Sequence, residues 1–371
     1  MKVKKKILYI TLRSDFGGGP MHVNTLIEHF EQTYDIFCAA PAEIPYGEKW
    51  KSELAEGHFL ELPHRTFSLK YLFRLVSFIK RNKIDIIHAH GKSAGIYSRL
   101  VKLFAHSVKL IFTFHGFHPG NYKQPVKLLY LLYERLTGRF IDYYINVSKG
   151  EQEQCLNNKV FDKSKSTVIY NAITIKKFED VTKYRLREQL FLPGKKFITI
   201  TANRFDHQKN MIATIEVARK LTEHKNIMFI LLGDGEEKNM IEQVVVDDKL
   251  ENVLMLGYKE NVLDYLFASD VCFSTSKGEG MPYSLIESTM IGLPLIVSNV
   301  TGNNEVVIHN YNGYLFEPND FDKAAEYILN LVNSSEIRER FSRNSIEVYY
   351  EKFRLDIMLT KVAKVYSKFL G

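Results

Sequence analysis

Long hydrophobic runs and cysteines are both scarce in this chain of 371 residues. No stretch approaches the roughly 18 uninterrupted apolar residues that a membrane-spanning helix needs. The apolar run within the opening MKVKKKILYITLRSD has only about seven residues, too few for the core of a signal peptide, and predicts a first buried strand. The three cysteines (Cys38, Cys155 and Cys272) lie far apart without metal-ligand spacing, which argues against a disulfide framework or a zinc site. We therefore expect a cytoplasmic protein.

A dinucleotide-binding fingerprint is also missing. Gly17 and Gly19 fit the start of G-x-G-x-x-G, but His22 occupies the sixth position. No acidic residue clearly ends the second predicted strand either. These two departures argue against a nicotinamide-dependent dehydrogenase.

Charge is unevenly distributed in an otherwise ordinary globular composition, with 45% hydrophobic and 25% charged residues. Residues 1–185 carry 29 Lys and Arg against 17 Asp and Glu, a net +12, whereas residues 186–371 carry 21 against 26, a net −5. A basic half indicates an anionic partner such as phosphate, nucleic acid or a lipid surface, and the alternative is a solvated basic surface. No nucleic-acid-binding motif accompanies the charge, so we expect no nucleic-acid partner.

Short β-rich runs alternate with helical segments from end to end. In the first half, the predicted strands are Lys6–Leu12, Asp35–Ala40, His58–Leu62, Ile84–His90, Val108–His115 and Asp142–Val147. The predicted helices there are Met21–Phe30, Ser68–Lys83, Ser93–Ala105 and Val126–Leu136. Continuous apolar strands separated by helices of this length are typical of parallel βαβ units.

The same alternation of strands and helices begins again after a charged stretch, Lys176–Pro193, which we interpret as a linker. The strands predicted beyond it are Phe197–Ala202, Ile227–Leu232, Asn252–Gly257, Val271–Thr275 and Leu295–Ser298, and the tail from Phe321 is helical. The pattern predicts an α/β protein with two Rossmann-like domains that face each other across a cleft. We place the domains at residues 1–180 and 181–350, with a helix over 351–371 that returns to the N-terminal domain.

Loops that follow parallel strands are where ligands bind in such sheets. In the first half, the glycine-rich loop Phe16–Pro20 could admit a phosphate or form a plain tight turn. His115 ends a strand and could donate a hydrogen bond or be structural. His88 and His90 alternate along one strand and so face the same side. Without an acidic or cysteine companion, they do not predict a metal site.

The loop Asn203–Asn210 follows the first strand of the second half. Arg204 and Lys209 in it can form a cationic clamp for a diphosphate, because Arg binds as a fork and Lys acts as a point charge. The turn Gly233–Glu236 follows the next strand and is consistent with a purely structural role.

The loop from Lys277 to Glu287 is the most informative. Pro282 stands where the first position of a helix is expected. The backbone N–H groups of Tyr283, Ser284 and Leu285 then belong to the first turn, which predicts an anion site at a helix N-terminus.

Two carboxylates flank this turn, Glu279 before the helix and Glu287 inside it. Both carboxylates would repel a phosphate. Their presence is explained if each accepts hydrogen bonds from hydroxyl groups, one carboxylate from those of a sugar and the other from those of a ribose. The alternative for Glu287 is a structural pair with a lysine.

These residues carry a resemblance. The segment EGMPYSLIE, which contains Glu279 and Glu287, together with Arg204 and Lys209 upstream, resembles the retaining glycosyltransferases of family 4, which have the GT-B fold. Supporting segments in family order are FGGGPMHV, DIIHAHG, TFHG, VIYNAI, LLGDGEE, LGYKENVLDYLFASDV and GNNEVVIHNYNGYLF. Pro20-Met21 replaces the usual Ala-Glu pair after the glycines, and Ala172 stands where Gly is common.

The resemblance implies a role for each matching position. The C-terminal domain would bind a nucleotide-sugar and the N-terminal domain the acceptor. The implied donor-binding residues are Gly18, Gly19, Arg204, Lys209, Tyr258, Gly280, Met281, Pro282, Ser284, Leu285 and Glu287. Arg204 and Lys209 would hold the diphosphate, and Glu287 the ribose. His115 and Glu279 would lie against the transferred sugar as the catalytic pair.

The expected reaction needs no cofactor and no metal. A cationic clamp and helix-end amides can stabilise the charge that grows on a leaving diphosphate. Asp320-Phe321-Asp322 formally fits a metal-binding DxD pattern, but its place at a helix start predicts a cap. The alternatives are a GT-B sugar-nucleotide epimerase and a non-catalytic sugar-nucleotide-binding protein.

The implied partners are a UDP-sugar donor, with GDP-sugars second, and a glycan or lipid-linked acceptor in polysaccharide biosynthesis. Two basic segments with aromatic and aliphatic residues, 68–83 and 122–139, predict peripheral contact with an anionic membrane. The alternative is that both helices simply cover the sheet with their apolar faces.

Overall fold

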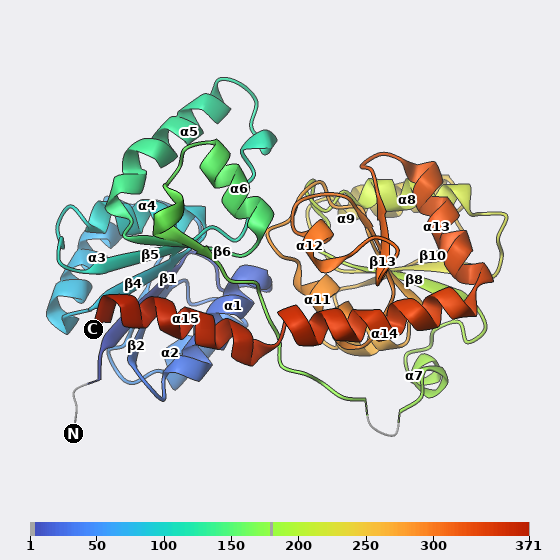
Figure 1. Cartoon of the computed structure of the whole chain (residues 1–371), viewed down its shortest axis with the longest axis horizontal. Coiled ribbons are helices and arrows are strands. Elements are labelled where there is room, and N and C mark those ends of the chain that lie inside the picture. The colour runs from blue at the N-terminus through green and yellow to red at the C-terminus, as the bar shows by residue number, and fades with distance from the viewer. Residues whose placement is uncertain (1–3, 179–180, 371) are drawn as a thin grey trace. The chain divides into compact units, whose positions relative to one another are not determined.

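The computed structural model describes residues 4–178 and 181–370, which form two α/β units (Figure 1). The first unit combines residues up to 171 with those from 356 onward, and the second comprises residues 172–355. The sequence predicts boundaries at 180 and 350, of which residue 180 lies outside the described residues. The first boundary lies earlier, between residues 171 and 172, because Ile173 already belongs to the second unit. The Ile173 N–H donates to the Phe353 carbonyl at 3.2 Å, and its carbonyl accepts from the Tyr349 hydroxyl at 3.0 Å.

The first unit contains a parallel seven-stranded sheet in the order β3-β2-β1-β4-β5-β6-β7. Its strands are β1 (Lys6–Thr11), β2 (Asp35–Ala40), β3 (Phe59–Glu61), β4 (Ile86–His90), β5 (Lys109–Thr113), β6 (Tyr143–Asn146) and β7 (Ser166–Val168). The central strands are buried along almost their whole length, which explains their continuous apolar sequence.

Helices cover both faces of this sheet. They are α1 (Gly18–Phe30), α2 (Tyr46–Glu53), α3 (Leu69–Asn82), α4 (Lys92–Val101), α5 (Val126–Thr137), α6 (Lys149–Asn157) and α15 (Leu355–Leu370). Three short 3-10 turns are η1 (Pro119–Asn121), η2 (Gly138–Phe140) and η3 (Lys163–Lys165). The sequence pattern missed α2, α6 and β7, which are short and only weakly apolar.

The second unit contains a parallel six-stranded sheet in the order β10-β9-β8-β11-β12-β13. Its strands are β8 (Phe197–Ala202), β9 (Ile227–Leu232), β10 (Val253–Gly257), β11 (Val271–Ser274), β12 (Leu295–Ser298) and β13 (Gly313–Phe316). Its helices are α7 (Lys183–Gln189), α8 (Met211–Lys220), α9 (Lys238–Asp247), α10 (Val262–Phe267), α11 (Tyr283–Met290), α12 (Asn303–Val306), α13 (Phe321–Asn333) and α14 (Ser335–Lys352).

The stretch interpreted as a linker is partly folded, so that prediction was wrong for its centre. Helix α7 lies within it, and the buried Arg187 of α7 donates to the Asp270 carboxylate at 2.6 Å. At least one charged residue of this stretch therefore forms an ion pair inside the second unit. The helix-cap interpretation of the DxD-like segment is confirmed, because the Asp320 side chain accepts from the backbone N–H of Lys323.

Both sheets reverse their strand order at one point, between β1 and β4 in the first unit and between β8 and β11 in the second. Open parallel sheets bind ligands at the carboxyl edge of such a switch point. The topology therefore selects the loops that follow these strands. Within the described ranges, no helix is both long and apolar enough to cross a bilayer.

Candidate functional site

In the second unit, Asp206 organises the loop after β8. One of its carboxylate oxygens accepts from the backbone N–H groups of Gln208 and Lys209 at 3.1 and 3.0 Å, and the other accepts from Arg204 Nε at 2.6 Å. Burial acts to raise the pKa of Asp206, but the Arg204 guanidinium, the Lys209 backbone N–H and the Lys209 charge together hold the pKa below its ordinary value. Sequence reasoning missed this residue, which fixes the turn that carries both predicted cations.

The loop after β11 meets the loop after β8 through an ion pair. Lys209 Nζ lies 2.6 Å from Glu279 Oε1, and Glu279 is only 6% exposed. The backbone N–H of Glu279 donates to the Thr301 carbonyl at 3.0 Å. At Gly302, where φ is +86°, a Cβ atom would lie 2.8 Å from the Cβ of Glu279. Glycine at that position lets the segment after β12 pack against Glu279 and hold it in place.

Helix α11 begins one residue later than the sequence predicted. Pro282 is the residue before its first turn, and its carbonyl accepts the Ile286 N–H at 3.3 Å. Tyr283, Ser284 and Leu285 form the first turn, whose N–H groups point along the helix axis toward the loop. Such a turn attracts anions through its N–H groups and the helix dipole.

Glu287 lies further along α11. Burial raises the pKa of its carboxyl to about 7, so the group is poised between its charged and neutral forms near neutral pH. Among the described residues, no ion pair joins Glu287 to a lysine. The expected hydrogen-bonding role of Glu287 stays a prediction.

The other predicted positions in this unit lie along the same carboxyl edge. Tyr258 follows the outer strand β10 and is 42% exposed, while Met281 is buried beside Gly280. The turn requires glycine at position 233, because a Cβ there would lie 1.8 Å from the Asn203 carbonyl oxygen.

In the first unit, the glycine-rich loop leads directly into α1. The helix begins at Gly18, three residues before its predicted start. A Cβ on Gly19 would lie 3.9 Å from Cδ2 of His115, so the predicted loop and the predicted histidine are neighbours. His115 adopts a left-handed backbone conformation with φ +57°. A residue other than glycine adopts this conformation at a cost in backbone energy.

Four histidines gather behind this loop. The rings of His88 and His90 lie 4.0 Å apart, which confirms that they share one side of β4. His90 Nδ1 lies 3.0 Å from His115 Nε2, and His88 Nδ1 lies 2.8 Å from the Tyr366 hydroxyl of α15. The fourth member, His22, was missed by sequence reasoning, although its place four residues before Leu26 puts it on the buried stripe of α1.

These histidines are neutral at pH 7. Burial lowers the pKa of His22 to about 4, and burial and neighbouring imidazoles hold the pKa values of His88, His90 and His115 well below their ordinary value. The candidate ligand nitrogens of His22, His90 and His115 lie within 4.8 Å of one another, and only His115 is not fully buried. Neutral imidazoles can bind a metal, so the expectation that no metal takes part stays a prediction.

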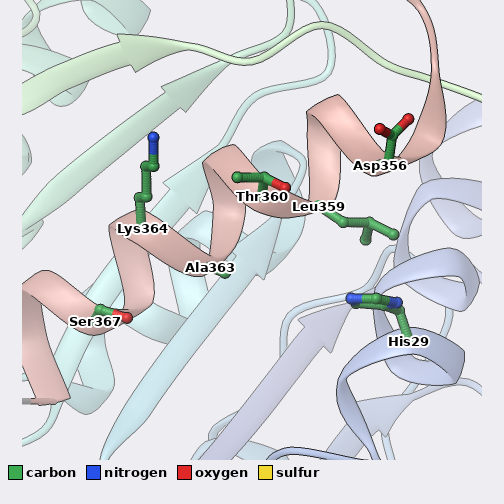
Figure 2. Close-up of a pocket in the computed structure, with 7 residues that line it drawn as sticks. All are labelled: His29, Asp356, Leu359, Thr360, Ala363, Lys364 and Ser367. Carbon is green, nitrogen blue, oxygen red and sulfur yellow. The ribbon is translucent and has the colours of Figure 1, made fainter.

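A separate hollow of about 500 Å³ lies between α1 and α15 (Figure 2). Its lining residues are His29, Asp356, Leu359, Thr360, Ala363, Lys364 and Ser367. His29 stands near the C-terminal end of α1, at the opposite end from the glycine-rich loop. The hollow is therefore remote from the carboxyl edge of the sheet and is not the candidate site.

Two family models match this chain, one over each half. The model of Glycosyltransferase Family 4 matches residues 16–177, and the model of Glycosyl transferases group 1 matches residues 182–348. One relative is the UDP-Gal:alpha-D-GlcNAc-diphosphoundecaprenol alpha-1,3-galactosyltransferase of Escherichia coli, which is 29% identical over 80% of this chain and 79% of its own length.

Solved structures share the fold. HepE from Anabaena, in complex with UDP and glucose, superimposes with a TM-score of 0.86 at 19% identity, covering 98% of this chain and 100% of that one. Sucrose-phosphate synthase from Thermosynechococcus elongatus superimposes with a TM-score of 0.82 at 20% identity, covering 98% and 99%. Because the two family models together span both α/β units, the chain belongs to glycosyltransferase family 4 and is a glycosyltransferase of the GT-B fold.

Proposed function

We propose that this glycosyltransferase moves a sugar from a UDP-sugar to a glycan or lipid-linked acceptor, with retention of the anomeric configuration. The observation that carries the proposal is the Lys209–Glu279 pair, which stands in the loops after β8 and β11 at the switch point of the second unit. Support for the donor comes from HepE, which was solved with UDP and glucose. The Escherichia coli galactosyltransferase, whose name specifies a UDP-sugar and a lipid diphosphate acceptor, supports both substrates.

Lys209 and Arg204 bind the donor diphosphate together with the first turn of α11. Each brings its own carboxylate partner, Glu279 for Lys209 and Asp206 for Arg204. The carboxylates hold the cations in place before the donor arrives, so little side-chain entropy is lost on binding. Glu287 accepts hydrogen bonds from the ribose hydroxyls.

Glu279 and His115 act on the transferred sugar. Glu279 accepts hydrogen bonds from sugar hydroxyls. Its ion pair with Lys209 partly neutralises the carboxylate, which lessens the repulsion between the carboxylate and the diphosphate. His115 is neutral and donates a hydrogen bond to the sugar.

The reaction proceeds on one face of the sugar. The bond from the anomeric carbon to the UDP oxygen breaks with its electron pair leaving on the phosphate, through an oxocarbenium-like transition state. The acceptor hydroxyl oxygen bonds to the same face of that carbon and passes its proton to the leaving phosphate oxygen. Side-chain cations and helix-end amides stabilise the growing negative charge, and no metal is required.

The donor is identified by screening UDP- and GDP-sugars for their effect on thermal unfolding, because a bound ligand raises the midpoint by mass action. We expect a UDP-sugar to give the largest shift, and proton NMR of the product to show the anomeric configuration of the donor. A product of inverted configuration would refute the retaining mechanism. Epimerised UDP-sugar formed without an acceptor would assign the alternative activity.

We further propose that the enzyme works as a peripheral protein at an anionic membrane, where lipid-linked acceptors are presented. The net charge of +12 over residues 1–185 supports this location.

A further inference from the structure

Helix α5 of the first unit leaves its apolar side uncovered. Five aliphatic side chains on it are about half exposed or more: Val126 52%, Leu128 60%, Leu129 62%, Leu132 47% and Leu136 60%. Leu128, Leu132 and Leu136 follow one another at four-residue spacing, and Leu129 lies beside them, so they share one face. A continuous apolar face exposed on a folded protein marks an interaction site.

The other basic segment identified in the sequence, residues 68–83, behaves differently. Helix α3 buries Leu72, Leu75, Val76, Phe78 and Ile79 in the core of the first unit. In α5, only Leu131 and Glu134 are buried. The alternative that apolar residues simply cover the sheet therefore explains α3 and fails for α5.

The inner side of α5 is firmly anchored. Glu134 is 1% exposed and pairs with the 2% exposed Arg99 of α4 at 2.5 Å, and Leu131 belongs to the core beside them. In Figure 1, α5 lies beyond α4 at the outer side of the first unit. The exposed leucines are thus presented by a helix whose orientation is fixed, and their exposure is not a result of loose packing.

Within residues 122–139, every charged side chain that is exposed or half-buried is positive. Lys123, Arg135 and Arg139 are exposed and Lys127 is half-buried, while the single acid between residues 122 and 139 is the buried, paired Glu134. Leucines flanked by lysine and arginine suit the boundary between acyl chains and anionic headgroups, because the long basic side chains can reach the headgroup phosphates while their stems stay apolar.

We propose that α5 is the element that inserts into an anionic bilayer, with its leucines among the acyl chains and its basic residues on the headgroups. The inference deepens the membrane location proposed above and names the residues responsible. It does not depend on the identity of donor or acceptor, because docking is measured without turnover.

Insertion is measured with a tryptophan placed on the exposed face. The chain has one native tryptophan, Trp50, which is 1% exposed and gives a constant background. We expect Leu129→Trp to shift its emission to the blue with vesicles of equal parts phosphatidylglycerol and phosphatidylcholine, and to be quenched by brominated lipid. The matched control is Val246→Trp on α9, a 68% exposed aliphatic position beside Asp247 and Asp248, which is expected to show neither effect.

Co-sedimentation with the same vesicles separates the apolar contribution to membrane binding from the electrostatic one. Leu128→Ser with Leu132→Ser is expected to lower the bound fraction about tenfold at all salt concentrations, since apolar transfer is lost. Lys123→Gln with Lys127→Gln is expected to weaken binding at low salt only, where screening is small. Unchanged midpoints of thermal unfolding establish that the variants fold.

Three results would overturn the proposal. The first is an unchanged bound fraction in the double serine variant, and the second is equal recovery with purely phosphatidylcholine vesicles at low salt. The third is a concentration-dependent dimer that the double serine variant abolishes, which would assign the face to a second copy of the chain. UDP-sugar affinity of the same variants, measured in solution, tests the proposed donor site separately.

Discussion

The raised pKa of Glu287 predicts that donor binding releases a proton. Burial lifts this pKa from 4.5 to about 7 in the unliganded protein. If ribose hydroxyls donate to the carboxylate, they favour the charged form and lower the pKa again. Binding then releases about half a proton at pH 7, about nine-tenths at pH 6 and about one-tenth at pH 8.

The same linkage sets the pH dependence of affinity. Because the protonated enzyme must first lose its proton, affinity is expected to be about fivefold weaker at pH 6 than at pH 7 and nearly constant above pH 8. The ligand should be UDP-glucose or another intact UDP-sugar, since the free phosphate end of UDP itself titrates near a pKa of about 6.

Isothermal titration calorimetry in buffers of different ionisation enthalpy counts the released protons directly. Glu287→Gln has nearly the same shape but cannot titrate, so it is expected to bind more weakly and without proton release between pH 6 and 8. Proton release that is absent in the unaltered enzyme, or that persists in the glutamine variant, would refute the assigned role of Glu287.

The remaining predictions concern other parts of the site and the core. Lys209→Met removes a charged hydrogen bond to the diphosphate and is expected to cost about 1.5–3 kcal/mol of UDP affinity, with Lys209→Arg as the charge-preserving control; equal affinity in calorimetry would remove Lys209 from the clamp. Glu279→Gln is expected to lower turnover. UDP affinity is expected to stay the same or rise, because the carboxylate no longer repels the phosphates. A large loss of UDP affinity would contradict the proposed place of Glu279 beside the sugar. Activity is expected to survive extensive treatment with EDTA, and complete loss restored by Mg²⁺ or Mn²⁺ would show that a metal is needed. Arg99→Met strands the Glu134 carboxylate in the core and is expected to destabilise the first unit by about 3–5 kcal/mol in denaturant unfolding, whereas the additional change Glu134→Leu restores most of that loss; full stability of the single variant would show that the pair is not needed.

The sequence by itself determined the alternating βα order, the parallel sheets and the loops that carry the candidate site. These follow from local signals: apolar runs of strand length, helical periodicity, and glycine and proline at turns. Arg204, Lys209 and the first turn of α11 could be named because each lies in the connection between a recognisable strand and the next helix.

Tertiary structure alone decided which of these groups meet. Lys209 and Glu279 pair across 70 residues, and Gly302 lets a distant segment pack against Glu279. Asp206, in contrast, acts through contacts two and three residues away, a local turn pattern that sequence reasoning overlooked. The pKa of Glu287 likewise depends on burial by distant segments.

The two basic helices make the same distinction. Both α3 and α5 are amphipathic and basic in sequence, yet the core takes up the apolar face of α3 and leaves that of α5 exposed. Periodicity fixes which residues of a helix share a face, because that depends on helix geometry alone. Whether this face meets the core or the solvent depends on the packing of neighbouring elements, which only the folded chain determines.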